Sequence, residues 1–267
     1  MNPIDTHTHT DCSVDGHCSL DALCGAAKQK GVRVLAVTEH YDFDTRGGRD
    51  YYMAHAARRY TEFARAREAA LETLLLYGIE IGQPHLAPAE TKAFIDANRF
   101  DMVIGSLHDL RPERDIYHIA YTDAAVCRAV LDDYYAEMLE LLAQPQFDTL
   151  GHLDYALRVM GTCFPSADLT PWRDAIDALL RRLVATGVAL ELNTAACRRW
   201  MGSLQHLRWV FERYRALGGE RVTTGSDAHR TDDLAAHMDE AYDLLRAAGF
   251  RYVTYYEQRT PHCVPLP

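Results

Sequence analysis

The sequence predicts an α/β protein, a closed or distorted (β/α) barrel built from about seven strand-and-helix units. Two observations predict it. Short apolar runs alternate with longer segments of helical period along the whole chain, as in a parallel sheet whose strands are joined by helices. Polar residues gather directly after the apolar runs, where the strands of such a barrel would end at one face. A flat doubly wound sheet is the alternative that the alternation also allows.

Seven short runs are expected to form the strands. Each run is mostly apolar, as a strand covered on both faces should be, and β-branched residues are frequent in them. The runs are Ile4 to Thr8, Val32 to Thr38, Leu74 to Ile79, Met102 to Ile104, Thr149 to Leu150, Val188 to Leu192 and Val222 to Thr224.

Helices are expected between these strands. Two carry start and stop signals: Ser19 precedes one and Gly31 follows it, while Pro171 begins another that Gly187 ends. The helices cover Leu20 to Gln29, Arg49 to Glu72, Pro88 to Ala97, Thr122 to Ala143, Thr170 to Thr186, Ser203 to Leu217 and Thr231 to Ala248. The tail from Arg251 indicates one more strand, a turn and an extended end. We expect residues 1–267 to form a single barrel domain.

Composition and charge exclude several function classes. The 267 residues carry a formal net charge of -10, so no diffuse positive field favours nucleic acid or an anionic membrane. The arginine-rich segment from Arg58 to Arg67 is expected to be a solvated helix face. No apolar run approaches the roughly 20 residues of a membrane span and no targeting segment is evident, so a cytoplasmic protein is expected. Seven scattered cysteines without a C-x-x-C pair indicate reduced thiols.

Histidines and carboxylates follow the strand-like runs. The ends of parallel barrel strands converge on one face, so such residues meet there although they are distant in sequence. Neutral imidazole and carboxylate bind Zn²⁺, Mn²⁺ or Fe²⁺, and the set is too large for one tetrahedral ion. We therefore expect a cluster of two or three divalent metal ions. The residues are His7, His9, His40, His108, His152 and His229, with Asp5, Asp15, Glu80 and Asp227.

The motifs of several other enzyme classes are missing. The chain contains no G-x-x-x-x-G-K-[ST] phosphate loop, no G-x-G-x-x-G, no G-x-S-x-G and no H-E-x-x-H. An amidohydrolase could also carry H-x-H on its first barrel strand, but its two-metal forms often bridge the ions with a modified lysine. None of the three lysines lies at a strand end, whereas Glu80 offers a bridging carboxylate.

Seven motifs in order resemble those of the PHP (polymerase and histidinol phosphatase) metal-dependent phosphoesterases. They lie between Asp5 and His229 and read D-x-H-x-H-T, S-x-D-G, T-E-H, G-I-E, G-S-L-H, G-H-L-D and G-S-D-A-H. The histidinol-phosphatase branch of this superfamily is the most similar. That likeness is carried by T-E-H-Y-D-F-D, by G-H-L-D-Y followed by Arg158, by L-E-L-N-T and by the tail Y-V-T-Y-Y-E-Q-R-T-P.

The resemblance implies a distorted (β/α)7 barrel with three metals at the C-terminal ends of its strands. It implies a first ion held by His7, His9, Glu80 and Asp227; a second held by Glu80, His108 and His152; and a third held by Asp15, His40 and His229. Arg158 is expected to hold phosphate oxygens with its planar fork, unless it pairs with a carboxylate such as Asp154. The expected catalytic residues are Arg158, His40 and Asp15. Weaker candidates for contacts to substrate or to the ligands are Asn193, Ser13, His17 and Glu39.

The function implied is hydrolysis of L-histidinol phosphate to histidinol and phosphate, a step of histidine biosynthesis. Metals suit this chemistry because they supply hydroxide near neutral pH and neutralise charge on phosphoryl oxygens. Two alternatives stay open: the same site could act on another small phosphoester such as a nucleotide, or the barrel could be a non-catalytic module that retains metals. The substrate is expected to be a small molecule. The sequence predicts neither the native metal nor the oligomeric state.

Overall fold

The computed structural model describes residues 2–44, 47–69, 72–112 and 114–266. Its main sheet has seven strands in the order β1-β2-β3-β4-β7-β8-β9, and all neighbouring strands run parallel. The seven predicted runs are therefore confirmed as strands, with shifts at their ends. The strands are β1 (Ile4–Asp5), β2 (Val34–Val37), β3 (Leu74–Gly82), β4 (Met102–Ser106), β7 (Thr149–Leu150), β8 (Ala189–Asn193) and β9 (Val222–Gly225).

The two edges of this sheet meet beyond the short strand β1. The Thr6 amide donates to the carbonyl of Thr224 at 2.9 Å, and Thr8 forms a parallel bridge with Ala228. These contacts join the segment after β1 to β9, so the sheet closes into a barrel. The predicted barrel is confirmed, and the flat doubly wound alternative is wrong.

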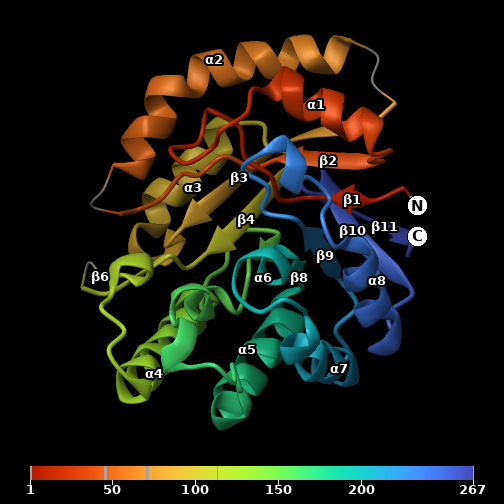
Figure 1. Ribbon diagram of the computed structural model, residues 1–267. Helices are drawn as coiled ribbons and strands as arrows, with labels where there is room; N and C mark the ends of the chain where they lie inside the picture. The colour runs from red at the N-terminus through yellow and green to blue at the C-terminus, as the bar shows by residue number, and fades with distance from the viewer. Residues whose placement is uncertain (1, 45–46, 70–71, 113, 267) are drawn as a thin grey trace.

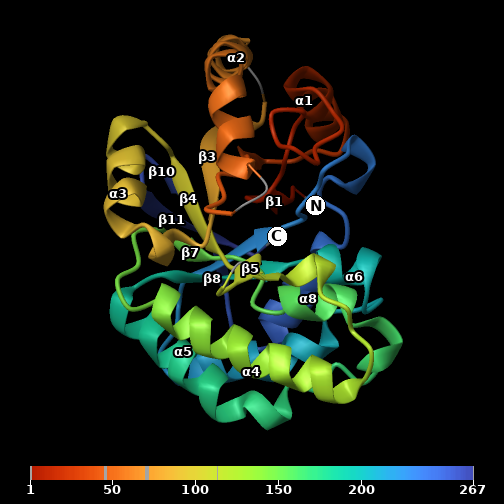
Figure 2. The ribbon, with the colours of Figure 1, turned by 90° about the vertical axis from the view of Figure 1, so that its left-hand side faces the viewer.

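Eight α-helices within the described residues surround the strands (Figure 1). Figure 2 shows α4 and α5 side by side along one flank of the barrel. The helices are α1 (Leu20–Gln29), α2 (Gly48–Glu68), α3 (Pro88–Ala97), α4 (Ala124–Leu141), α5 (Arg173–Thr186), α6 (Ala195–Arg199), α7 (Arg208–Ala216) and α8 (Met238–Ala247). A small hairpin, β5 (Asp109–Leu110) with β6 (Arg114–Asp115), and the short helix α6 were not predicted.

Local signals mark several helix ends. The Ser19 side chain accepts from the amide of Ala22 at 3.2 Å, and Gly187 ends α5 with φ at 74°.

The predicted helices from Thr170, Ser203 and Thr231 contain short 3₁₀ turns ahead of α5, α7 and α8. The 3₁₀ turns are η1 (Pro84–Leu86), η2 (Ile116–His118), η3 (Tyr155–Val159), η4 (Gly161–Cys163), η5 (Thr170–Trp172), η6 (Gln205–Leu207) and η7 (Thr231–Asp233).

A hairpin closes the N-terminal end of the barrel interior. It consists of β10 (Tyr252–Glu257) and β11 (Thr260–Pro265), so the predicted extended end is a second strand. At its turn, the Arg259 amide donates to the carbonyl of Asp101, one residue before β4. The hairpin packs on the apolar interior of the barrel. That cluster comprises Ile4, Val34, Ala36, Leu76, Met102, Ile104 and Ala189 from the barrel with Val253 and Tyr256 from the hairpin.

One arginine of α2 departs from the predicted solvated face. Arg59 is buried and donates to the Val37 carbonyl at 3.0 Å and to the Tyr52 hydroxyl at 3.1 Å. Its guanidinium carbon lies 4.0 Å from the centroid of the Tyr77 ring. The solvated-face prediction is wrong for this residue because it satisfies strand carbonyls beneath the helix. In the described part of the chain, no helix is long and apolar enough to cross a membrane.

Candidate metal centre

The first group of candidate metal ligands lies where β1, β3 and β9 end. The Nε2 atoms of His7 and His9 lie 3.1 and 3.5 Å from Glu80 Oε2. Asp227 Oδ1 is 3.5 Å from His9 Nε2 and 3.9 Å from His7 Nε2. All four side chains are buried. Two imidazoles and two carboxylates therefore converge on one small space.

The second group uses the other oxygen of Glu80. Glu80 Oε1 lies 2.9 Å from Nε2 of His152 and 3.3 Å from Nε2 of His108. The Ser106 hydroxyl, at the end of β4, donates to this same oxygen at 2.6 Å. Since Oε2 faces the first group and Oε1 faces the second, Glu80 stands between the two and could bridge two ions.

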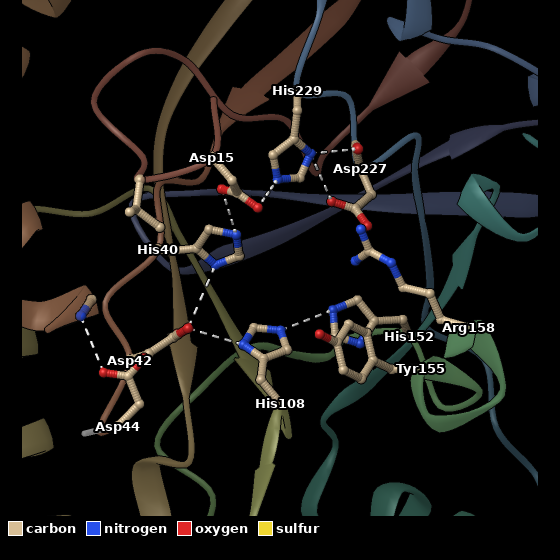
Figure 3. A pocket seen from close by; sticks show the side chains of 12 residues that line it. Asp15, His40, Asp42, Asp44, His108, His152, Tyr155, Arg158, Asp227 and His229 are labelled. Carbon is tan, nitrogen blue, oxygen red and sulfur yellow. Dashed lines mark hydrogen bonds and ion pairs between the residues drawn. The ribbon is translucent and has the colours of Figure 1, made fainter. Parts of the chain in front are cut away.

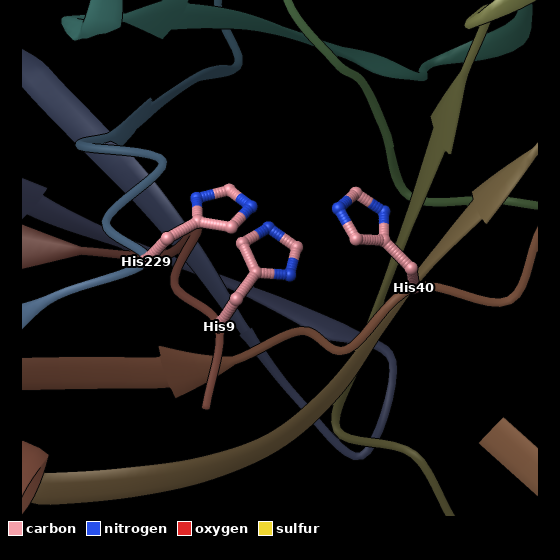
Figure 4. Close-up of side chains that lie close together, drawn as sticks. All are labelled: His9, His40 and His229. Carbon is pink, nitrogen blue, oxygen red and sulfur yellow. The ribbon is translucent and has the colours of Figure 1, made fainter. Parts of the chain in front are cut away.

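The third group lies toward solvent. Asp15 has one oxygen 3.5 Å from His40 Nε2 and the other 3.1 Å from His229 Nε2. The His9 ring stacks against both imidazoles, with centroids 4.2 Å from His40 and 4.3 Å from His229 (Figure 4). The third group therefore adjoins the first. All nine predicted metal ligands lie at this one mouth of the barrel.

Buried atoms at the centre of these groups lie close to one another as ion pairs, but none of them completes a well-formed hydrogen bond. A buried polar atom without a partner is costly, and nearly all such atoms in proteins are satisfied. These atoms belong to overlapping groups of donors, and divalent cations held between them would satisfy them. The donors fit Zn²⁺, Mn²⁺ or Fe²⁺ because they are imidazoles and carboxylates. The atoms are His7 Nε2, His9 Nε2, His40 Nδ1, Glu80 Oε2 and His229 Nε2.

Without a cation, the electrostatics give metal-binding protonation states to the carboxylates and to His9 but not to every imidazole. Burial raises the pKa of Glu80, but the imidazoles around it, His7 first, outweigh burial and hold this pKa well below its usual range. The pKa of Asp227 is likewise lowered, because contact with neighbouring imidazoles exceeds the effect of burial. Burial, and then the neighbouring His40, lower the pKa of His9 well below its usual range. Burial also lowers the pKa of His7, His40 and His108, but the carboxylates beside these imidazoles outweigh burial and raise this pKa. Ionised carboxylates and neutral imidazole are the forms that bind metal.

Several imidazoles are oriented by a partner on their second nitrogen. His7 Nδ1 lies 2.7 Å from Glu191 Oε1, and His108 Nδ1 lies 3.1 Å from Asp42 Oδ2. Such contacts fix the ring so that Nε2 faces the centre. The backbone at the end of β9 must pass close by: a Cβ on Gly225 would lie 2.3 Å from His7 Cβ. Only glycine fits this position.

Glu191 is a candidate functional residue that the sequence did not predict. Besides contacting His7, it accepts from the amide of His152 at 2.8 Å, so one carboxylate positions two groups of the mouth. One feature of the sequence could have indicated Glu191: it is a carboxylate within the otherwise mostly apolar strand β8. An acidic side chain in a strand covered on both faces needs a partner.

A cavity of about 200 Å³ opens beside the groups (Figure 3). Arg158 lines it, with its guanidinium carbon 5.6 Å from the Tyr155 ring centroid. Asp154, the expected competing partner of Arg158, instead contacts His206 Nε2 at 2.8 Å. Asp42 and Asp44 also line the cavity, and Tyr155 is a lining residue that the sequence did not predict. The lining also includes Asp15, His40, His108, His152, Asp227 and His229.

The weaker candidates do not line this cavity. Ser13 lies 3.2 Å from His9 Nδ1 and donates to Glu39, so both residues position the ligands from behind. Asn193 is buried and donates to Glu191 at 3.3 Å, while His17 is exposed outside the cavity. Another carboxylate lies apart from the three groups: Asp5 accepts from the Ser226 amide at 2.8 Å and hydroxyl at 2.6 Å.

Comparisons with known proteins agree with this geometry. The model of the PHP domain family matches residues 5–195. The chain is 26% identical over 258 residues to the probable histidinol-phosphatase of Clostridium acetobutylicum, covering 96% of this chain and 97% of that protein. It is 25% identical over 254 residues to the histidinol-phosphatase of Lactococcus lactis subsp. lactis, covering 94% and 93%.

A solved structure shares the fold. The chain superposes with a TM-score of 0.82 and 22% identity on the crystal structure of histidinol phosphate phosphatase from Lactococcus lactis subsp. lactis, complexed with zinc, L-histidinol and phosphate. The likeness covers 98% of this chain and 99% of that one. The closed barrel described above is thus a fold already seen in a phosphatase.

Proposed function

The chain belongs to the PHP domain family, and from this premise we propose that it is a metal-dependent phosphomonoesterase that hydrolyses L-histidinol phosphate. The observation that carries the proposal is the convergence of six imidazoles with Asp15, Glu80 and Asp227 at one mouth, beside a cavity lined by Arg158. A non-catalytic barrel would have no need of an arginine beside an intact set of metal donors. The names of the two relatives, matched over nearly their whole length, support the substrate.

The number of ions follows from the three donor groups, and we infer three sites. Divalent ions bound there supply acidified water and positive charge for the phosphoryl oxygens. Glu80 shares its two oxygens between the first and second groups, so it sets the separation of their centres. Asp15 and His40 belong to the most exposed group, where the phosphate enters. Zn²⁺ is the first candidate, because imidazole-rich sites suit it and a relative's structure contains it.

Arg158 acts on the substrate through its planar fork. Its guanidinium lies over Tyr155 and 5.4 Å from the Tyr117 ring centroid, which limits its rotation. A rigid guanidinium binds two phosphate oxygens at once and costs little conformational entropy to order. Arg158 therefore orients the phosphoryl group toward the metal-binding side chains.

Turnover of a substrate panel tests the proposal. Protein stripped of metal and reloaded with Zn²⁺ or Mn²⁺ is offered L-histidinol phosphate, nucleoside monophosphates and sugar phosphates, and released phosphate is measured. We expect the highest kcat/KM for L-histidinol phosphate and no turnover after chelation. Preference for a nucleotide would assign the site to another ester. Absence of turnover with every substrate at full metal occupancy would indicate a non-catalytic module.

A further inference from the structure

A second set of metal-binding side chains lies outside the barrel mouth. Cys197 comes from α6, while His237 immediately precedes α8 and Glu240 lies in its first turn. One donor atom from each of the three lies within 4.8 Å of the others. His237 Nδ1 is 2.6 Å from Glu240 Oε1, and Cys197 Sγ is 3.7 Å from Glu240 Oε2. None of them lines the cavity described above.

We propose that Cys197, His237 and Glu240 form a separate site for one divalent ion of the Zn²⁺ class. Thiolate, imidazole and carboxylate are the three donor types that zinc accepts, and three protein ligands leave a fourth position for water. Binding forms a bond from the Cys197 sulfur to the metal and releases the thiol proton to solvent.

The arrangement suits an ion for geometric reasons. His237, just before α8, and Glu240, in its first turn, lie side by side, as the contact between their side chains shows. Their side chains are 37% and 45% exposed, which gives an ion a path of entry, whereas the Cys197 thiol lies buried beneath them. An i,i+3 pair joined by a third donor from another helix can surround an ion from three directions.

The backbone around the three ligands is held independently of them. The Thr194 hydroxyl, just before α6, donates to the Ala236 carbonyl at 2.7 Å, next to His237. Arg198 forms an ion pair with Asp233 at 3.2 Å in the same pair of segments. The backbone therefore already holds the three side chains near one another. An ion bound between them would join α6 to α8 without a large rearrangement.

Cobalt provides a probe specific to this site. No side chain of the three groups at the mouth is a cysteine, so a thiolate-to-cobalt charge-transfer band in the near ultraviolet would report on a thiol ligand. The metal-free full-length protein is titrated with Co²⁺ and followed by absorption. We expect this band in the natural protein, its loss in Cys197→Ser and its retention in the control Cys163→Ser, whose thiol contacts the Tyr121 carbonyl instead.

Stoichiometry gives a second readout. Elemental analysis after Zn²⁺ loading should find one ion fewer per chain in Cys197→Ser, with phosphatase activity unchanged. The exposed His237→Asn keeps a residue that tolerates the left-handed backbone there, so it should fold, and its affinity for Co²⁺ at this site should fall at least about tenfold. A natural protein without the band, or equal zinc content in all variants, would overturn the proposal and leave a hydrogen-bonded trio.

Discussion

The two ends of the barrel interior differ completely in chemistry although the same strands build both. At the N-terminal end, Leu76 and Ile104 pack against the hairpin residue Val253. At the mouth, the same two strands present Glu80 and lead to His108. Leu76 and Glu80 are four residues apart on β3, and an even spacing places both side chains on the inward face.

This difference teaches how stability and function are divided along each strand. Buried apolar groups stabilise the fold wherever they pack, whereas clustered buried imidazoles and carboxylates with unpartnered atoms oppose it unless cations join them. The closed end must therefore provide the stability that the open end lacks without metal. Substitutions at the two ends should separate the two properties.

Glu80→Gln should have the largest effect. A neutral amide cannot bridge two cations. The substitution also removes the negative charge that Glu80 places between the first and second groups. We expect kcat to fall by about 10³-fold or more, with at least one metal lost per chain. Steady-state kinetics and elemental analysis measure the two effects.

The fold should survive this substitution, since no apolar contact is removed. Circular dichroism of the metal-free variant should match that of the metal-free natural protein. Retention of both metal content and activity would show that Glu80 is not a ligand, and the division between the two ends would fail.

Leu76→Ala should give the opposite pattern. The side chain is fully buried among the barrel and hairpin residues, so its truncation leaves a cavity and should lower the free energy of unfolding by about 2–5 kcal/mol. Metal content and kcat of the folded fraction should stay near those of the natural protein. Denaturant unfolding measures the first quantity. A large loss of kcat in the folded variant would mean that the two ends are coupled.

Sequence prediction succeeded where the deciding forces are local. Helices α1 and α3 have their predicted bounds, because capping and proline signals lie within the segments themselves. The convergence of the candidate metal donors could be predicted because the ends of parallel strands meet at one face of a barrel. The first strand was predicted over five residues but pairs regularly over only two, since its continuation bends to close the barrel on β9.

Residues that act through distant partners escaped prediction. Glu191 contacts His7, which is 184 positions away in the sequence. No neighbouring residue of either one indicates that the two side chains meet. Arg59 reads as one more cation in a charged helix, yet it satisfies a carbonyl of β2. The hairpin was expected as a strand and tail because its role as the floor of the barrel depends on long-range packing.

Arg158→Ala tests the cavity without touching the metal groups. The variant loses a charge-assisted contact to phosphate, worth about 1.5–3 kcal/mol, so kcat/KM should fall by about 10- to 100-fold. Metal content should not change, because Arg158 contacts no predicted ligand among the described ion pairs. Arg158→Lys should recover only part of the loss, since an ammonium lacks the planar fork. A drop in metal content would reassign the arginine to the support of the mouth.

Glu191→Gln should have the smallest effect and is the finest test of the comparison. Gln keeps one oxygen that can accept from His7 Nδ1, but its amide nitrogen cannot accept from the backbone amide of His152. The imidazole of His7 would be less firmly oriented, and metal affinity at the mouth should fall by about tenfold. Competition with a chelator measures this affinity. Because Glu191 lies behind the ligands, kcat at saturating metal should recover almost fully; a loss that excess metal does not restore would place Glu191 in the reaction itself.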